Sequence, residues 1–215
     1  MNDELRMNRA VIIVERLLPP LFRSLCRHPN DLSFAAKHFA GTSIVMVRPH
    51  DDDFPLVMGS GAKTFRSIKT ILRAIGERHG HKIELEHLQG GRPKDSPKTV
   101  WAPVGPNPDF DLTPLRRLLV QTVQAFTDGA SFLVTKDGSS HRIQVEVPEA
   151  NGVNELEMES ALNTVFNAGA KLRGGEVRIV FKVGPLEGAV PMTPEALIEL
   201  QPETADGRFS KEERL

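Results

Sequence analysis

The sequence is poor in features that mark several classes of protein. Its 215 residues include one cysteine, Cys26. A single cysteine excludes a disulfide within the chain and a metal site built from several cysteines, and it is typical of a reducing compartment. The apolar run Ala10–Val14 ends at Glu15-Arg16 and is too short for a membrane span or a signal sequence. We therefore expect a cytoplasmic protein with no membrane segment.

The chain also lacks an excess of charge of either sign. Its 27 Lys and Arg against 28 Asp and Glu give a net charge of −1. A nucleic-acid site therefore has to be a local patch rather than a property of the whole surface. One such patch lies in residues 63–82, where Glu77 is the one acid among the basic residues Lys63, Arg66, Lys69, Arg73, Arg78 and Lys82.

Motifs for catalysis and metal binding are lacking as well. There is no G-x-S-x-G and no H-E-x-x-H. The seven histidines include His79, His81 and His87, which we interpret as solvated or hydrogen-bonded because no cysteine accompanies them. The run Asp51–Asp53 is interpreted as a helix cap. We expect no catalysis, no metal and no cofactor.

A glycine-rich turn does stand out, at Met58–Thr64, directly before the basic helix. The backbone N–H groups at a helix start suit a phosphate. A P-loop would need glycines where Val57 and Ala62 stand, and a dinucleotide fingerprint would need a third glycine. The remaining match is the G-x-x-G loop of a KH module, which holds the backbone of four single-stranded nucleotides. The alternative is a tight turn followed by a solvated basic face.

Hydrophobic periodicity and helix stop signals predict the elements of the first half. We expect the Pro19-Pro20 pair to separate two helices. The expected helices cover residues 2–18, 20–27, 54–58 and 63–79, and the expected strands cover 32–38, 42–48 and 82–86.

Residues 17–88 resemble the small bacterial KH-domain RNA-binding proteins, which consist of a type II KH module. The residues that carry the resemblance are His28-Pro29-Asn30-Asp31-Leu32, Val47-Arg48-Pro49, Gly59–Thr64 running into Ile68–Ile71, and Lys82–Glu86. Two departures are that Ala62 replaces the last loop glycine and that Ser60-Gly61 lacks a basic residue.

The second half repeats this order after a Pro/Gly-rich segment. We expect helices over 113–126 and 154–172 and strands over 131–135, 141–147 and 176–183. The glycine turn is missing there, and acids surround the start of the last helix. The expected organisation is a KH-like domain at 1–88, a linker at 89–111 containing Trp101, a degenerate KH-like domain at 112–183 and a tail at 184–215 with a short helix. Docking of Trp101 is favoured over base stacking.

The predicted fold class is α+β, with two tandem KH-like type II units, each a three-stranded sheet with helices on one face. The resemblance implies a non-catalytic binder of single-stranded RNA, an RNA chaperone or post-transcriptional regulator. The alternative is a protein-interaction module that kept the KH scaffold; a protein partner or self-association is compatible with either. The expected RNA-binding residues are Gly59, Ser60, Gly61, Ala62, Lys63, Arg66, Lys69 and Arg73.

Overall fold

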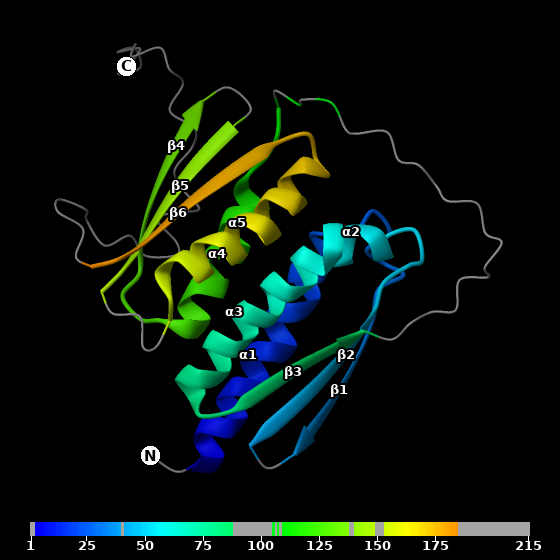
Figure 1. Ribbon diagram of the computed structural model, residues 1–215, viewed down its shortest axis with the longest axis vertical. Coiled ribbons are helices and arrows are strands. Elements are labelled where there is room, and N and C mark those ends of the chain that lie inside the picture. Colours follow the sequence, from blue (N-terminus) through cyan, green and yellow to red (C-terminus); the bar gives the residue numbers. More distant parts are fainter. Residues whose placement is uncertain are drawn as a thin grey trace, which may run out of the picture.

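The computed structural model describes residues 3–39, 41–87, 105, 107, 109–137, 140–148 and 153–184. Each half contains a three-stranded sheet and helices that cover one of its faces (Figure 1). The first half comprises α1 (Asp3–Arg23), β1 (Ser33–Phe39), β2 (Thr42–Arg48), α2 (Phe54–Met58), α3 (Lys63–His79) and β3 (Lys82–His87). The second half comprises α4 (Thr113–Phe126), β4 (Ser131–Asp137), β5 (Ser140–Val147), α5 (Glu155–Lys171) and β6 (Glu176–Val183).

The two sheets have the same topology. In the order β1-β2-β3, the first pair is antiparallel and the second is parallel, and β4-β5-β6 repeats both relations. A parallel neighbour needs a crossover connection, which α3 provides in the first half and α5 in the second. The predicted α+β class and the two tandem KH-like units are confirmed.

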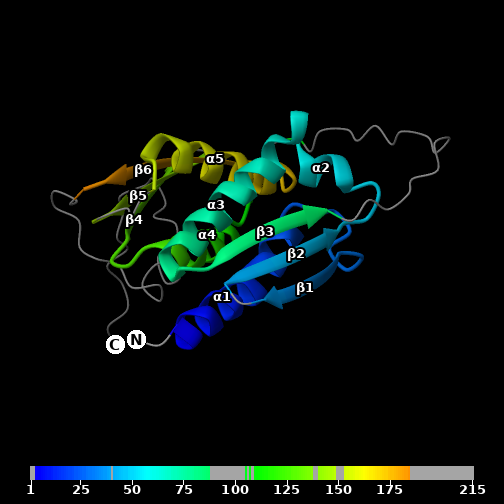
Figure 2. The same cartoon turned by 60° about the horizontal axis from the view of Figure 1, so that its bottom comes forward.

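The helices of both halves lie between the two sheets, as Figure 2 shows from a second direction. Each helix has an apolar stripe at helical spacing, for example Leu18, Leu21 and Leu25 along and just after α1 and Ile68 and Ile75 on α3, all buried. The stripes of the two halves merge into one hydrophobic core. The two halves therefore pack together as an internal pseudo-dimer.

Two hydrogen bonds between the halves are related by this pseudo-symmetry. His79 Nε2 lies 3.1 Å from the carbonyl oxygen of Ala125, beside the end of α4. Arg173 Nη1 donates to the carbonyl oxygen of Ser24, just past the end of α1, at 2.8 Å. His79 and Arg173 each precede the left-handed glycine that follows a crossover helix. Each half therefore places a side-chain nitrogen against a carbonyl near the end of the other half's first helix, where carbonyl groups lack partners within the helix.

The expected break at Pro19-Pro20 is wrong, because α1 continues through both prolines to Arg23. Proline removes a backbone donor inside a helix. Here Val14 and Leu18 before the prolines and Leu21 after them are all buried at helical spacing. A continuous helix keeps these side chains on one line against the core, and this burial outweighs the loss of two backbone donors at Pro19 and Pro20.

Part of the predicted linker packs onto the second half. The Phe110 ring lies over Gly175, where a Cβ atom would overlap the ring, and Asn107 N donates to Gly174 O at 2.8 Å. Trp101 and the predicted tail helix fall outside the described residues. Among the residues that are described, no helix is both long enough and apolar enough to cross a membrane.

Candidate nucleic-acid interface

The predicted loop lies between α2 and α3 and has an unusual backbone. Gly59 ends α2 with φ 70° and ψ 173°, and Gly61 has φ 55°. Residues Ser60–Ala62 form one 3₁₀ turn, in which Ala62 N donates to Gly59 O at 3.1 Å. A Cβ atom at Gly59 would overlap the Thr64 side chain. Gly59, in the first loop position, therefore needs to be glycine because of its positive φ and its close contact with Thr64. Gly61, in the third position, needs to be glycine because of its positive φ.

Ala62, in the fourth position, also has a left-handed backbone, with φ 59° and ψ 26°. It is the one non-glycine residue with positive φ among those described. This conformation costs a residue with a Cβ roughly 1–2 kcal/mol. The chain therefore keeps the loop geometry that glycine would adopt freely, at an energetic cost.

The start of α3 is open to an anion. No side chain caps it, and its first turn carries no acid. Lys63, Arg66 and Lys69 are exposed on the helix that follows the loop. Arg66 Nη2 donates to Gly61 O at 2.7 Å, which places a guanidinium against the loop backbone. The helix dipole and these side chains together make this end of the first half positive.

Arg73 differs from the other expected RNA-binding residues. Its Nη2 lies 2.8 Å from Glu157 Oε1 on α5, and Thr70 Oγ1 donates to the same oxygen at 3.3 Å. Both ends of the ion pair are partly exposed. The structure therefore brings the loop, Lys63, Arg66 and Lys69 together at one end of α3, and directs Arg73 to the interface between the halves.

Aromatic rings lie beside the loop, between α3 and the end of β3. The ring of His87 lies 5.7 Å from that of Phe54 on α2 and 5.6 Å from that of Phe65 on α3, measured between centroids. Lys69 Nζ lies 5.3 Å from the centroid of Phe65. The sequence analysis did not single out His87 for this region, because only the end of β3 brings it next to two helices.

The start of α5 has the opposite chemistry. Asn154 Oδ1 accepts a hydrogen bond from Glu157 N at 3.0 Å and caps the helix. Glu155 and Glu157 stand in its first turn. These carboxylates repel a phosphate at the position where α3 would attract one.

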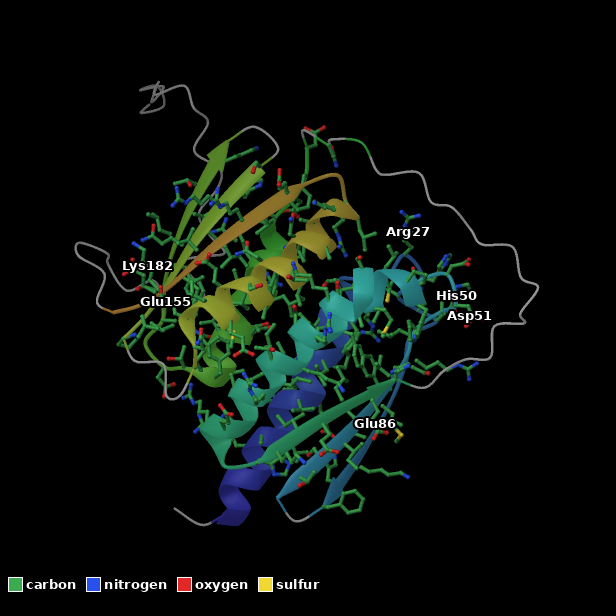
Figure 3. The ribbon with its side chains drawn as sticks, in the orientation of Figure 1. Arg27, His50, Asp51, Glu86, Glu155 and Lys182 are labelled. Atoms are coloured by element: carbon green, nitrogen blue, oxygen red, sulfur yellow. The ribbon has the colours of Figure 1, made fainter. Side chains whose placement is uncertain are left out.

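The outer edge of β6 is covered by side chains of α5, which we call the polar stripe: Glu155, Glu159, Asn163 and Asn167. Asn163 Oδ1 accepts from Ile179 N at 2.7 Å, and its Nδ2 donates to Ile179 O at 2.5 Å. The carboxylate of Glu159 accepts from Phe181 N at 3.0 Å. Figure 3 shows Glu155 next to the end of β6 near Lys182, where its carboxylate accepts from Val183 N at 3.3 Å. The edge of this sheet is therefore closed by the protein itself.

The same edge of the first sheet has no such cover in the described part of the chain. The helices α3 and α5 can be aligned on the glycine that follows each of them. In this alignment, Lys69 is equivalent to Asn163, and Phe65 is equivalent to Glu159. No hydrogen bond from an α3 side chain to the β3 backbone is found among the described residues. The i, i+4 spacing of the polar stripe is visible in the sequence, but this spacing alone does not show that the side chains bond to a neighbouring strand, because polar helical faces are usually solvated.

Among proteins of known function, the chain is similar to the RNA-binding protein KhpA of Streptomyces coelicolor, with 30% identity over 73 residues. The RNA-binding protein KhpA of Streptomyces lividans gives the same identity over the same length. The match covers 91% of each relative and 34% of this chain. No protein-family model and no solved structure matches the chain.

Proposed function

Because the chain belongs to the KhpA family of bacterial KH-domain proteins, we propose that it binds single-stranded RNA without catalysis, through the loop Gly59–Ala62 and the start of α3. The observation that carries the proposal is the loop backbone, which stays left-handed at Ala62 although alanine disfavours it. Such a turn ahead of an uncapped, acid-free helix start presents backbone donors to a phosphate.

The proposed contacts divide between phosphate and base. Lys63 and Arg66 are exposed beside the loop and neutralise backbone charge. The partly exposed rings of Phe54 and His87 lie together at the end of β3, where an unstacked base finds aromatic surface, and the buried ring of Phe65 packs against His87. Arg73 contributes only if RNA displaces Glu157 from it.

We assign RNA binding to a domain at residues 1–88 and a supporting, non-binding role to the domain at 112–183. The closed β6 edge and the acidic start of α5 support this division. We propose that its cellular role is that of a cytoplasmic RNA chaperone or post-transcriptional regulator.

The test combines Ser60→Asp with Lys63→Ala. Both side chains are exposed, so the fold should survive. A carboxylate about 4 Å from a phosphate costs about 4 kcal/mol at an effective dielectric constant near 20, before salt screening. We expect affinity for a short single-stranded RNA to fall at least about tenfold, and the salt dependence to flatten by about one unit because one cation is lost.

The matched control is Ser160→Asp with Lys171→Ala on α5, which makes the same change in charge at exposed positions. It should bind RNA as the wild type does. Circular dichroism melts establish that both variants are folded. Unchanged RNA affinity in the folded loop variant would rule out the loop as the site.

A second candidate is a protein-interaction module on the KH scaffold. The observation that favours it is the Arg73–Glu157 ion pair, which removes one of the four basic side chains expected to bind RNA from the proposed RNA face. Wild-type protein that binds no RNA at low salt would make this candidate the leading one.

A further inference from the structure

Two turns that are far apart in the sequence bring three metal-ligating side chains together. His28 lies in the turn after α1, and His50 and Asp52 lie in the turn before α2. One ligand atom of each residue lies within 4.8 Å of the other two, and the centroids of the two imidazole rings are 4.6 Å apart. All three residues are half-buried. Figure 3 shows His50 beside α2 at the outer end of the first half, with Arg27 nearby.

A fourth residue, Asp53, holds the two turns against each other. Its side chain is fully buried, and it accepts hydrogen bonds from Arg27 N at 2.9 Å and from His28 N at 2.8 Å. Asp53 belongs to the run that was expected to cap α2, but α2 has no side-chain cap and the Asp53 carboxylate is directed to the other turn. His50 O in turn accepts from Asp53 N at 2.9 Å. The backbone that carries the three side chains is therefore fixed in place before any ligand binds.

The donor set favours a transition metal over Mg²⁺ or Ca²⁺, because two of its three members are imidazoles. His50 Nδ1 accepts from Asp52 N at 3.2 Å, so this is the unprotonated ring nitrogen, and a metal ion bound to it would replace this hydrogen bond. The same nitrogen lies 3.9 Å from Asp52 Oδ2. Ligands of a tetrahedral Zn²⁺ ion with bonds near 2.0–2.1 Å are about 3.3 Å apart, so a small side-chain movement closes the site.

The nearby thiol of Cys26 does not belong to the site. The ligand atoms that lie together are those of His28, His50 and Asp52, and the sulfur of the buried Cys26 is not among them. The set is therefore two histidines and one carboxylate, which leaves one tetrahedral position for water.

We propose that His28, His50 and Asp52 form a binding site for a divalent transition metal of the zinc class. The bound ion joins the turn after α1 to the turn before α2. Since α2 ends at Gly59, the ion also fixes the element that carries the candidate RNA loop. No sequence motif indicates this site, because the spacing between His28 and His50 matches no metal motif and only the fold brings these residues together.

The test uses the full chain, without RNA, and Zn²⁺ and Co²⁺ as probes. Calorimetry should show one saturable Zn²⁺ site, and Zn²⁺ at 100 times its Kd should raise the Tm by about 5–10 °C. Co²⁺ should give the intense visible absorption of a four-coordinate ion. His50→Ala and Asp52→Asn should each weaken binding at least about tenfold and abolish that absorption. Neither residue makes the Asp53 contacts through its side chain, so both variants should fold.

The matched control is His38→Ala, which removes another histidine that lies beside a carboxylate, with His38 Nε2 3.4 Å from Glu15 Oε1. This variant should bind Zn²⁺ as the wild type does. The proposal is overturned if the wild type shows no saturable site, if the two site variants bind as tightly as the wild type, or if His38→Ala weakens binding to the same degree. None of these outcomes depends on whether the protein binds RNA.

Discussion

The backbone amides at the start of α3 meet no acid and no capping side chain, whereas at the start of α5 Asn154 caps the helix and two glutamates stand in its first turn. The outer strand edges differ in the same sense, since Asn163 and Glu159 cover β6 and the described residues of α3 leave β3 uncovered. Both halves have the same sheet order and strand directions. One scaffold thus supports a surface that attracts an anion and a surface that excludes one, because function depends on the side chains at the site and not on the fold.

The largest expected effect comes from separating the halves. Residues 1–90 alone would lose α4 and α5, which complete the core around α1 and α3. A unit of this size has little core of its own. We expect this fragment to unfold without a cooperative transition or to self-associate, and to become monodisperse when residues 105–184 are added. Analytical ultracentrifugation and thermal melts check this; a stable, monomeric 1–90 fragment would show that the halves are independent.

The polar stripe can be tested by replacing the side chains at equivalent positions of α5 and α3 with alanine. Asn163→Ala removes two hydrogen bonds to Ile179 and should lower the free energy of unfolding by about 1–3 kcal/mol, with no effect on RNA affinity. Lys69→Ala, at the equivalent position of α3, should change stability by less than about 0.5 kcal/mol but weaken RNA binding. Urea titrations and RNA binding measure both quantities. The comparison fails if both variants behave alike.

Ala62→Gly addresses the strained loop position. Glycine adopts the left-handed backbone without a steric cost, although it also loses more entropy on folding. We expect a net stabilisation of about 0.5–1 kcal/mol in urea unfolding. Ala168→Gly inside α5 is the matched control, and it should destabilise the protein by about 1 kcal/mol because the helix interior disfavours glycine. A loss of stability in Ala62→Gly would contradict the left-handed geometry.

The smallest effect at neutral pH concerns His79 and Arg173, which make the two reciprocal contacts between the halves. Burial lowers the pKa of His79 below its usual value of 6.5. The unfolded chain then binds more protons than the folded chain, so stability should decrease as the pH falls below about 6.5. Burial also lowers the pKa values of His81 and His141 and adds to this trend.

His79→Gln should flatten that decrease, since an amide can donate to Ala125 O but does not titrate. Arg173→Gln should lower the free energy of unfolding by the same amount at each pH tested, because the guanidinium keeps its charge throughout this range. Chemical unfolding at pH 5, 6, 7 and 8 distinguishes the two. An unchanged pH profile in His79→Gln would assign the acid sensitivity to other groups.

Local sequence determined the elements and their order. The glycine that ends α3, the apolar spacing along α3 and α4 and the alternation in the strands each act within a few residues, so the bounds Lys63–His79, Thr113–Phe126 and Glu176–Val183 could be predicted. The loop could be found for the same reason, since Gly59, Gly61 and Ala62 are adjacent and their chemistry is local. The repeated order of elements also indicated that the chain contains two such units.

Only the tertiary structure decided how particular polar side chains are used. Asp53 bonds to the turn after α1 and leaves α2 without a side-chain cap, Arg73 pairs with Glu157 of the other half, and α1 continues through Pro19 and Pro20. In each case the partner or the buried surface comes from a distant part of the chain. A long polar side chain has several possible partners, and a helix tolerates proline when its buried face is long enough, so the folded arrangement selects an outcome that local propensity leaves open.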